Sequence, residues 1–290
     1  YADLRWENIL RVLSDHAVKY SGVPKFPEVG RDLVLVLDKE LSFSALESLA
    51  FEVERKLLRS VNLFDVYEGE IFAVLGGSGS GKSTLLRHLL GLDRPAAGEV
   101  TIDGDDISSC NEDALQQILR KVGVLYQSAA LFGSMTVAEN VALPIFEYTD
   151  LPAESVNSLV NIKLNLVNLD GYQNHLPSEI SGGMKKRAGL ARAMALNPKI
   201  LFFDEPSAGL DPITSAELDN LIVHLNQSLG TTMVIITHEL ESIFAVAHRV
   251  IMLHKSTRGI IADGDPIYLR DQSRNPFVKQ FFNRLPAENT

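Results

Sequence analysis

The segment GGSGSGKS, residues 76–83, constrains the fold of this chain more than any other part of its sequence. It has the form G-x-x-x-x-G-K-S, follows an apolar run at 70–75 and precedes a helical pattern at 82–90. Glycines let the backbone wrap around an anion and point N–H groups at it, and a helix N-terminus adds partial positive charge. We therefore predict a phosphate-binding loop between a buried strand and a helix.

The residue types in this loop suggest which groups contact a nucleotide. Lys82 can reach the β- and γ-phosphates, and the Ser83 hydroxyl can ligate Mg²⁺. The alternative, a Gly/Ser-rich turn with an unrelated lysine, is disfavoured by the strand–loop–helix setting. The candidate nucleotide-binding residues here are Gly76, Gly77, Ser78, Gly79, Ser80, Gly81, Lys82, Ser83 and Thr84.

Two carboxylates end a second apolar run, ILFFDE, at residues 200–205. Asp204 is 204 − 82 = 122 residues from Lys82, so the two meet only through the fold. At the carboxyl end of a strand, Asp204 suits holding Mg²⁺, and Glu205 suits polarising an attacking water as general base. The alternative is an acidic pair that caps a turn. His238, after the apolar run MVIIT, is a candidate contact for the γ-phosphate.

Apolar runs alternate with helical patterns along most of the chain, which predicts an α/β fold with a parallel sheet. A mostly helical stretch at 136–196 interrupts this alternation and suggests an inserted helical subdomain at about 128–196. The expected division is an N-terminal segment of uncertain structure (1–44), a main domain (45–265) and a helical C-terminal tail (266–290). The expected strands are 70–75, 99–102, 122–126, 200–203, 233–237 and 250–253.

Charge and hydrophobicity exclude some classes of partner. The formal net charge is −10, which argues against a general nucleic-acid binder because phosphate backbones require a positive footprint. No stretch reaches the 18 or so apolar residues that a membrane helix needs, so any membrane role is expected to depend on a partner.

Six ordered segments together resemble the ATPase subunit of ABC transporters over roughly residues 46–284. Besides the loop at 76–83, similar to Walker A, and Asp204–Glu205, similar to Walker B, four further segments match. They are Gln127 as the Q-loop glutamine, residues 181–187 (SGGMKKR) as the family signature, residues 208–211 (AGLD) as the D-loop and His238 as the switch histidine.

This resemblance implies a P-loop ABC ATPase fold with a mixed sheet, ATP and Mg²⁺ as cofactors, and ATP hydrolysis. It implies a head-to-tail homodimer in which Ser181, Gly182 and Gly183 face the γ-phosphate held by the other protomer. Ser181 can cap the following helix, and the two glycines allow close approach to an anion. By the same resemblance, Gln127 senses Mg²⁺ and links the site to a membrane partner, and Asp211 belongs to the nucleotide site.

The sequence departs from the family pattern at several positions. Ile180 and Met184 replace the usual Leu and Gln of the signature, and Gly209 stands where Ala is common in the D-loop. The family has an adenine-stacking aromatic upstream of Gly69, for which Phe51 is the candidate and Tyr67 a weaker one. Simple core packing of Phe51 is the alternative.

The sequence is most similar to one branch of the family, the ATPases of bacterial Mla/MCE phospholipid transport systems. The segments that carry this similarity include SGGMKKRAGLARAMALNP at 181–198 and the tail NPFVKQFFNR at 275–284. It implies an integral membrane permease, a STAS-type accessory protein, a periplasmic MCE lipid-binding protein, and a place on the cytoplasmic face of the inner membrane. The alternatives are an ABC ATPase for another solute, or a non-transport ABC protein.

Overall fold

The computed structural model describes residues 66–285. Phe51, the N-terminal segment of uncertain structure (1–44) and its expected boundary with the main domain lie outside the described residues. Among the described helices, none combines the length and apolar character needed to cross a bilayer.

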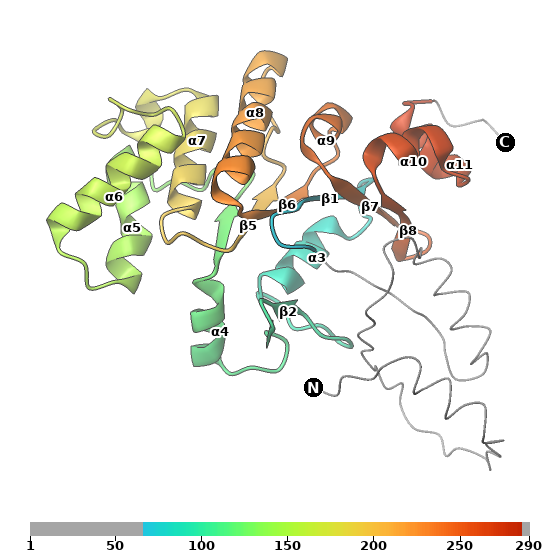
Figure 1. Ribbon diagram of the computed structural model, residues 1–290, viewed down its shortest axis with the longest axis horizontal. Coiled ribbons are helices and arrows are strands. Elements are labelled where there is room, and N and C mark those ends of the chain that lie inside the picture. The colour runs from blue at the N-terminus through green and yellow to red at the C-terminus, as the bar shows by residue number, and fades with distance from the viewer. Residues whose placement is uncertain (1–65, 286–290) are drawn as a thin grey trace, which may run out of the picture. The chain divides into compact units, whose positions relative to one another are not determined.

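A six-stranded mixed sheet in the order β4-β5-β6-β1-β7-β8 organises the described residues (Figure 1). Neighbouring strands from β4 to β7 run parallel, and β8 pairs antiparallel with β7 at the edge. The predicted strands lie within one or two residues of those observed. The strands are β1 (Ile71–Gly76), β4 (Val122–Leu125), β5 (Ile200–Asp204), β6 (Thr232–Ile236), β7 (Arg249–His254) and β8 (Gly259–Gly264).

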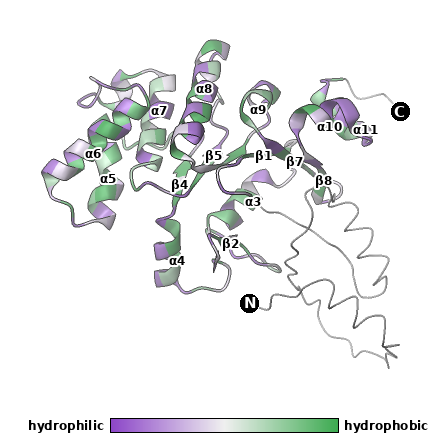
Figure 2. Ribbon diagram, in the orientation of Figure 1, coloured by the Kyte–Doolittle hydropathy of each residue, from purple (hydrophilic) through white to green (hydrophobic). Residues whose placement is uncertain are grey.

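Both faces of the sheet are covered, which explains why its strands are continuous apolar runs instead of alternating ones. In Figure 1, α8 (Pro212–Leu229) and α9 (Leu240–Val246) lie on one face, and α3 (Lys82–Leu89) lies on the other. All six residues of β1 and all five of β6 are buried. Figure 2 shows the central strands largely in the hydrophobic colour, whereas the surrounding helices carry both colours.

Three helices gather beside the β4 edge of the sheet (Figure 1): α5 (Val137–Tyr148), α6 (Ala153–Leu166) and α7 (Gly182–Ala193). A capping box between Thr136 and Glu139 starts α5. The buried amide of Asn140 donates to the carbonyls of Phe132 and Met135 and so fixes the loop before α5. These helices occupy the stretch in which the sequence predicts an inserted subdomain, and its boundaries stay a prediction.

The remaining elements are short, and some of them leave no clear pattern in the sequence. The described part of the C-terminal tail contains two helices. The strand expected at 99–102 is only two residues long and pairs with a second two-residue strand. Three elements were not predicted from the sequence: this partner strand, the edge strand β8 and the helix α4. These elements are β2 (Thr101–Ile102), β3 (Asp105–Asp106), α4 (Glu112–Leu119), the 3₁₀ helix η1 (Pro177–Glu179), α10 (Pro266–Gln272) and α11 (Pro276–Phe282).

We predict that Gly123→Ala destabilises the protein by about 1–3 kcal/mol. Gly123 is buried on β4, and a methyl group there would collide with the backbone oxygen of Ala193 in α7 and lie 2.7 Å from Leu201 Cδ2. Backbone cannot move aside cheaply, so the strand and helix must separate. Gly133→Ala is the control, because nothing lies within 4 Å of the added methyl group. Equal urea unfolding free energies for the two variants would contradict the prediction.

Candidate functional site

The carboxyl ends of the parallel strands bring the predicted motifs to one edge of the sheet. β1 leads into the loop at 76–83, β4 leads to Gln127, β5 ends at Asp204, and β6 leads to His238. Ligands of open α/β sheets bind outside the carboxyl ends of the strands. The parallel register therefore assembles segments that are far apart in the sequence.

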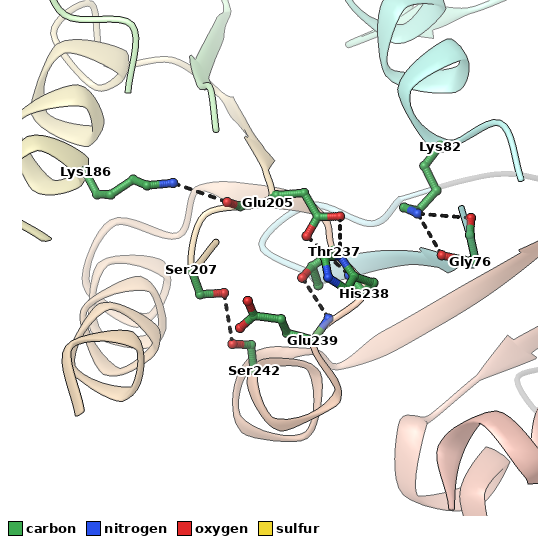
Figure 3. A network of polar contacts seen from close by, with 10 residues as sticks. Gly76, Lys82, Lys186, Glu205, Ser207, Thr237, His238, Glu239 and Ser242 are labelled. Atoms are coloured by element: carbon green, nitrogen blue, oxygen red, sulfur yellow. Dashed lines mark hydrogen bonds and ion pairs between the residues drawn. The ribbon is translucent and has the colours of Figure 1, made fainter. Parts of the chain in front are cut away.

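The loop at 76–83 folds around its own lysine. Lys82 Nζ donates to the carbonyl oxygen of Gly76 at 2.7 Å and to that of Gly77 at 3.4 Å (Figure 3). A side chain at Gly76 would collide with the Ser80 hydroxyl and lie 2.7 Å from the backbone oxygen of Leu253, so only glycine fits there.

Polar groups of this loop remain available to a ligand. The Ser80 hydroxyl is buried and has no hydrogen-bond partner among the described residues. Gly81, at φ 100°, precedes α3, and no side chain caps the first-turn N–H groups of that helix. Ser83 and Thr84 of the first turn are exposed. An orphaned hydroxyl, an uncapped helix N-terminus and a lysine together fit a phosphate group.

Asp204 connects the loop electrostatically with the end of β5. Burial raises the pKa of Asp204, and the nearby charge of Glu205 raises it further, whereas Lys186 and Lys82 oppose the shift. The charge of Lys82 therefore bears on Asp204, although the two residues are 122 positions apart in the sequence. Carboxylate, amide and hydroxyl oxygens such as those of Asp204, Gln127 and Ser83 are the hard donors that Mg²⁺ prefers.

Glu205 has an unusual backbone conformation. Its φ is 46°, in the left-handed region that side-chain-bearing residues rarely occupy. Its N–H donates to the Ile236 oxygen at 2.8 Å, which ties it to the end of β6. Non-glycine residues in this conformation cost about 1–3 kcal/mol and concentrate at functional sites.

The carboxylate of Glu205 is held by His238. Oε1 of Glu205 lies 2.8 Å from Nδ1 of His238, and Oε2 accepts from the His238 N–H at 3.4 Å (Figure 3). The Glu205 side chain is 14% exposed and that of His238 is 62% exposed. The histidine therefore orients the carboxylate from the solvent side and reaches further into solvent than the glutamate does.

The signature segment starts α7 in the predicted way. Ser181 is exposed, and its hydroxyl accepts from the N–H of Met184 at 3.3 Å. Among the described residues, no hydrogen bond or ion pair connects Ser181–Gly183 with the loop at 76–83 of the same chain.

Asp211 is engaged with its own helix. It caps α8, and its carboxylate accepts from the N–H groups of Ile213 and Thr214, both at 3.1 Å, and from the Thr214 hydroxyl at 2.5 Å. Any contact of Asp211 with nucleotide therefore stays a prediction.

Lys186, for which the sequence suggests no role, lies between two of the predicted site residues, Gln127 and Glu205. Its ammonium donates to the backbone oxygens of Gln127 and Glu205. The Gln127 side chain itself is exposed.

Within the described residues, no cluster of three or more His, Cys, Asp or Glu side chains could hold a metal ion.

This arrangement is that of a P-loop nucleotide-binding protein. A family model described as ABC transporter matches residues 58–208, just over half of the chain. The chain therefore belongs to the ABC transporter family. The predicted α/β ABC ATPase fold and the resemblance to this family are confirmed.

Curated relatives include proteins named for different substrates. The probable ribonucleotide transport ATP-binding protein mkl of Mycobacterium leprae is 41% identical over 76% of this chain and 62% of its own length. The intermembrane phospholipid transport system ATP-binding protein MlaF of Escherichia coli K12 is 41% identical over 76% of this chain and 81% of its own length. The methionine import ATP-binding protein MetN of Geobacillus kaustophilus is 38% identical over 76% of this chain and 64% of its own length. This chain spans about three fifths of the length of the mycobacterial relatives it matches.

Solved ABC cassettes share the fold. A dimer of the cassette MJ0796 in a post-hydrolysis state, bound to ADP and Pi, superposes with a TM-score of 0.63 at 34% identity and covers 70% of this chain and 88% of its own. The cbiO1 protein of Clostridium perfringens, part of the transporter complex cbiONQ, superposes with a TM-score of 0.67 at 26% identity. The match covers 77% of this chain and 88% of cbiO1.

The carboxyl of Asp219 is buried, and Ser242 connects it to the loop that follows Glu205. Asp219 of α8 is 6% exposed, and its neighbour Ser242 of α9 lies 3.3 Å from Ser207, hydroxyl to hydroxyl (Figure 3). Burial raises the pKa of Asp219, a hydrogen bond with Ser242 opposes this shift, and Glu239 adds to it.

We predict that Asp219→Asn makes the protein more stable at neutral pH. Because the pKa of Asp219 is higher in the folded than in the unfolded state, unfolding releases a proton. The free energy of unfolding therefore falls as pH rises from the ordinary carboxyl range through the raised pKa. An amide at this position has no charge to bury, so the variant should escape this loss.

Urea unfolding of parent and variant across the acidic to neutral range measures this effect. The two should be about equally stable at low pH, where both groups are neutral, and should diverge as pH rises. A stability difference that is constant with pH, or a variant that is less stable at neutral pH, would contradict the prediction.

Proposed function

We propose that this chain is the ATP-hydrolysing subunit of an ABC transporter, with Glu205 as general base. The observation that carries this proposal is the carboxylate of Glu205, which His238 holds directly after β5 and next to Asp204, whose charge is influenced by Lys82 of the phosphate loop. A base held in one orientation next to a phosphate site suits the activation of water for attack on a γ-phosphate.

The roles proposed for the loop follow from its geometry. The N–H groups of the loop and of the first turn of α3 receive the phosphates, and the buried Ser80 hydroxyl gains a partner. Lys82 exchanges the carbonyls of its own loop for phosphate oxygens. The residues that form this cradle are Gly76, Gly77, Ser78, Gly79, Ser80, Gly81, Lys82, Ser83 and Thr84.

Ser83, Gln127 and Asp204 are the proposed ligands of Mg²⁺, Asp204 through water. The ion, when bound, neutralises charge that develops on the phosphate oxygens. The raised pKa of Asp204 fits this role, because a half-buried carboxylate gains stability when a cation arrives beside it. Glu205 takes the proton of the attacking water, and His238 keeps the carboxylate pointed at that water.

A second copy of the chain is proposed to complete each site. Ser181 and Gly182 are exposed at the start of α7, and among the described residues no hydrogen bond or ion pair joins them to their own phosphate loop, so they are available to an anion held by the second copy. The dimeric state of the solved MJ0796 cassette supports this arrangement. Asp211, beside this segment in the fold, is proposed to belong to the same interface.

The membrane part of the transporter is proposed to be a separate integral permease, which holds this chain on the cytoplasmic face of the inner membrane. The segment after β4 is the candidate contact, because Tyr126 is 38% and Phe132 is 52% exposed there. Phospholipid is the proposed cargo, on the similarity to MlaF. A STAS-type accessory protein and a periplasmic MCE lipid-binding protein belong to the same proposal, and no nucleic acid partner is expected.

We predict that Glu205→Gln binds ATP with nearly parental affinity but lowers turnover by at least about 10²-fold, the usual contribution of a general base. Because ATP stays intact, closed dimers should accumulate. Phosphate release measures turnover, and size-exclusion chromatography with ATP measures dimers. Glu154→Gln, an exposed carboxyl at the start of α6, is the control. Unimpaired turnover of Glu205→Gln would remove Glu205 from the role of base.

We predict that the chain co-purifies with an integral membrane protein from detergent-solubilised membranes and that phospholipid vesicles carrying this complex consume ATP. The Phe132→Asp variant should lose the membrane protein while keeping its own ATP binding, because a charge replaces an exposed apolar contact. Co-purification with ribosomes or DNA would favour a non-transport role. If the ATPase activity of the complex responds to another solute and not to phospholipid, only the proposed lipid cargo is wrong.

A further inference from the structure

Lys186 is a buried lysine beside the carboxyl ends of β4 and β5, where the proposed catalytic residues lie. It extends from α7 and is 5% exposed. Its Nζ donates to the backbone oxygen of Gln127 at 2.5 Å and to that of Glu205 at 3.3 Å. Figure 3 shows the lysine approaching Glu205 from α7, opposite to the side on which His238 lies.

The register of the sheet places these two carbonyls at the same level. Leu125 of β4 pairs with Phe203 of β5 as the last pair of that ladder. Gln127 and Glu205 each lie two residues further along, where the strands have stopped bonding to each other. The Lys186 ammonium bridges the gap and supplies donors that the ladder no longer provides.

The carbonyl of Glu205 belongs to a strained peptide. With φ at 46°, this residue stays in its conformation only because its surroundings hold it. Its N–H is tied to Ile236, and its oxygen accepts from Ala208 at 3.2 Å as well as from Lys186. Release of the oxygen would let the backbone relax and turn the carboxylate away from its present direction.

Charge also favours a lysine at this position. Burial lowers the pKa of Lys186, and the carboxylates of Asp204, Glu239 and Glu205 oppose that shift. The positive charge of Lys186 is therefore favoured by the acidic groups around the end of β5. A neutral side chain would keep neither the charge nor both hydrogen bonds.

Close packing fixes the helix that carries this lysine. Gly183 and Gly189 lie three residues before and after Lys186. A methyl group at Gly183 would lie 2.5 Å from Thr214 Cγ2, and one at Gly189 would lie 2.9 Å from Leu125 Cδ1. The helix therefore approaches α8 and β4 too closely to shift without moving its neighbours.

We propose that Lys186 is a positioning residue that ties Gln127 and the general base Glu205 to the helix starting at Ser181. This role rests on the proposed function of Glu205. Because the Ser181 end of α7 is the part that meets the nucleotide of the second copy, a displacement of the helix there changes the backbone of the base in its own chain. Lys186 thereby links the two sites of the dimer.

The test replaces Lys186 in the full chain and measures ATP hydrolysis as kcat and KM. Lys186→Met keeps the length and apolar stem but loses the donors and the charge. It should lower kcat by about 10- to 100-fold, with KM for ATP within about threefold, because orientation of the base fails while binding remains. Lys186→Arg, which keeps donors and charge, should restore at least about a third of parental kcat.

Lys163→Met is the matched control. Lys163 is also 5% exposed, and its Nζ donates to Asn197 Oδ1, outside the residues proposed for catalysis. It should keep parental kcat. If Lys186→Met does not fold, as judged by thermal unfolding, Lys186→Gln takes its place, since its amide is too short to reach both carbonyls.

A double-mutant cycle separates positioning from a direct effect. In the Glu205→Gln background, Lys186→Met should change the residual single-turnover rate by less than about twofold, because the lysine acts through Glu205. Fully additive losses, parental kcat in Lys186→Met, or an equal loss in Lys163→Met would overturn the positioning role alone. Parental turnover in Glu205→Gln would instead overturn the proposed function.

Discussion

Parallel pairing of the strands from β4 to β7 is the constraint on which the rest of the site depends. Because every strand of this set points the same way, the phosphate loop after β1, the acidic end of β5 and the histidine after β6 leave the sheet at one edge. The register then sets their relative height, as the equivalent positions of Gln127 and Glu205 show. Helices on both faces keep this sheet buried and leave that edge for function.

The residues at this edge are individually unfavourable to stability. Glu205 holds a left-handed backbone, and burial acts against the charges of Asp204 and Lys186, the first through a raised pKa and the second through a lowered pKa. Such groups persist because the surrounding structure determines their positions and because opposite charges lie close together. The strain and the buried charge therefore belong to the site and not to the core that supports it.

The sequence predicted most of the fold because strands buried on both faces appear as short apolar runs between glycines and charges. It missed β3 because two residues are too few to form a pattern, and it missed β8 because an edge strand is only half covered. Helix α4 could have been found from Asn111, which caps it by accepting from Ala114. Lys186 escaped notice because a lysine between Lys185 and Arg187 suggests an exposed, charged helix face.

The sequence by itself determined the family, the phosphate loop and which side chains stand at the strand ends, because these depend on residue type and short spacing. Only the tertiary structure decided which of them meet: that His238 holds Glu205 and that Lys186 reaches two backbone oxygens. Local sequence fixes local conformation, whereas contacts between residues 33 or 59 positions apart arise from strand order and register.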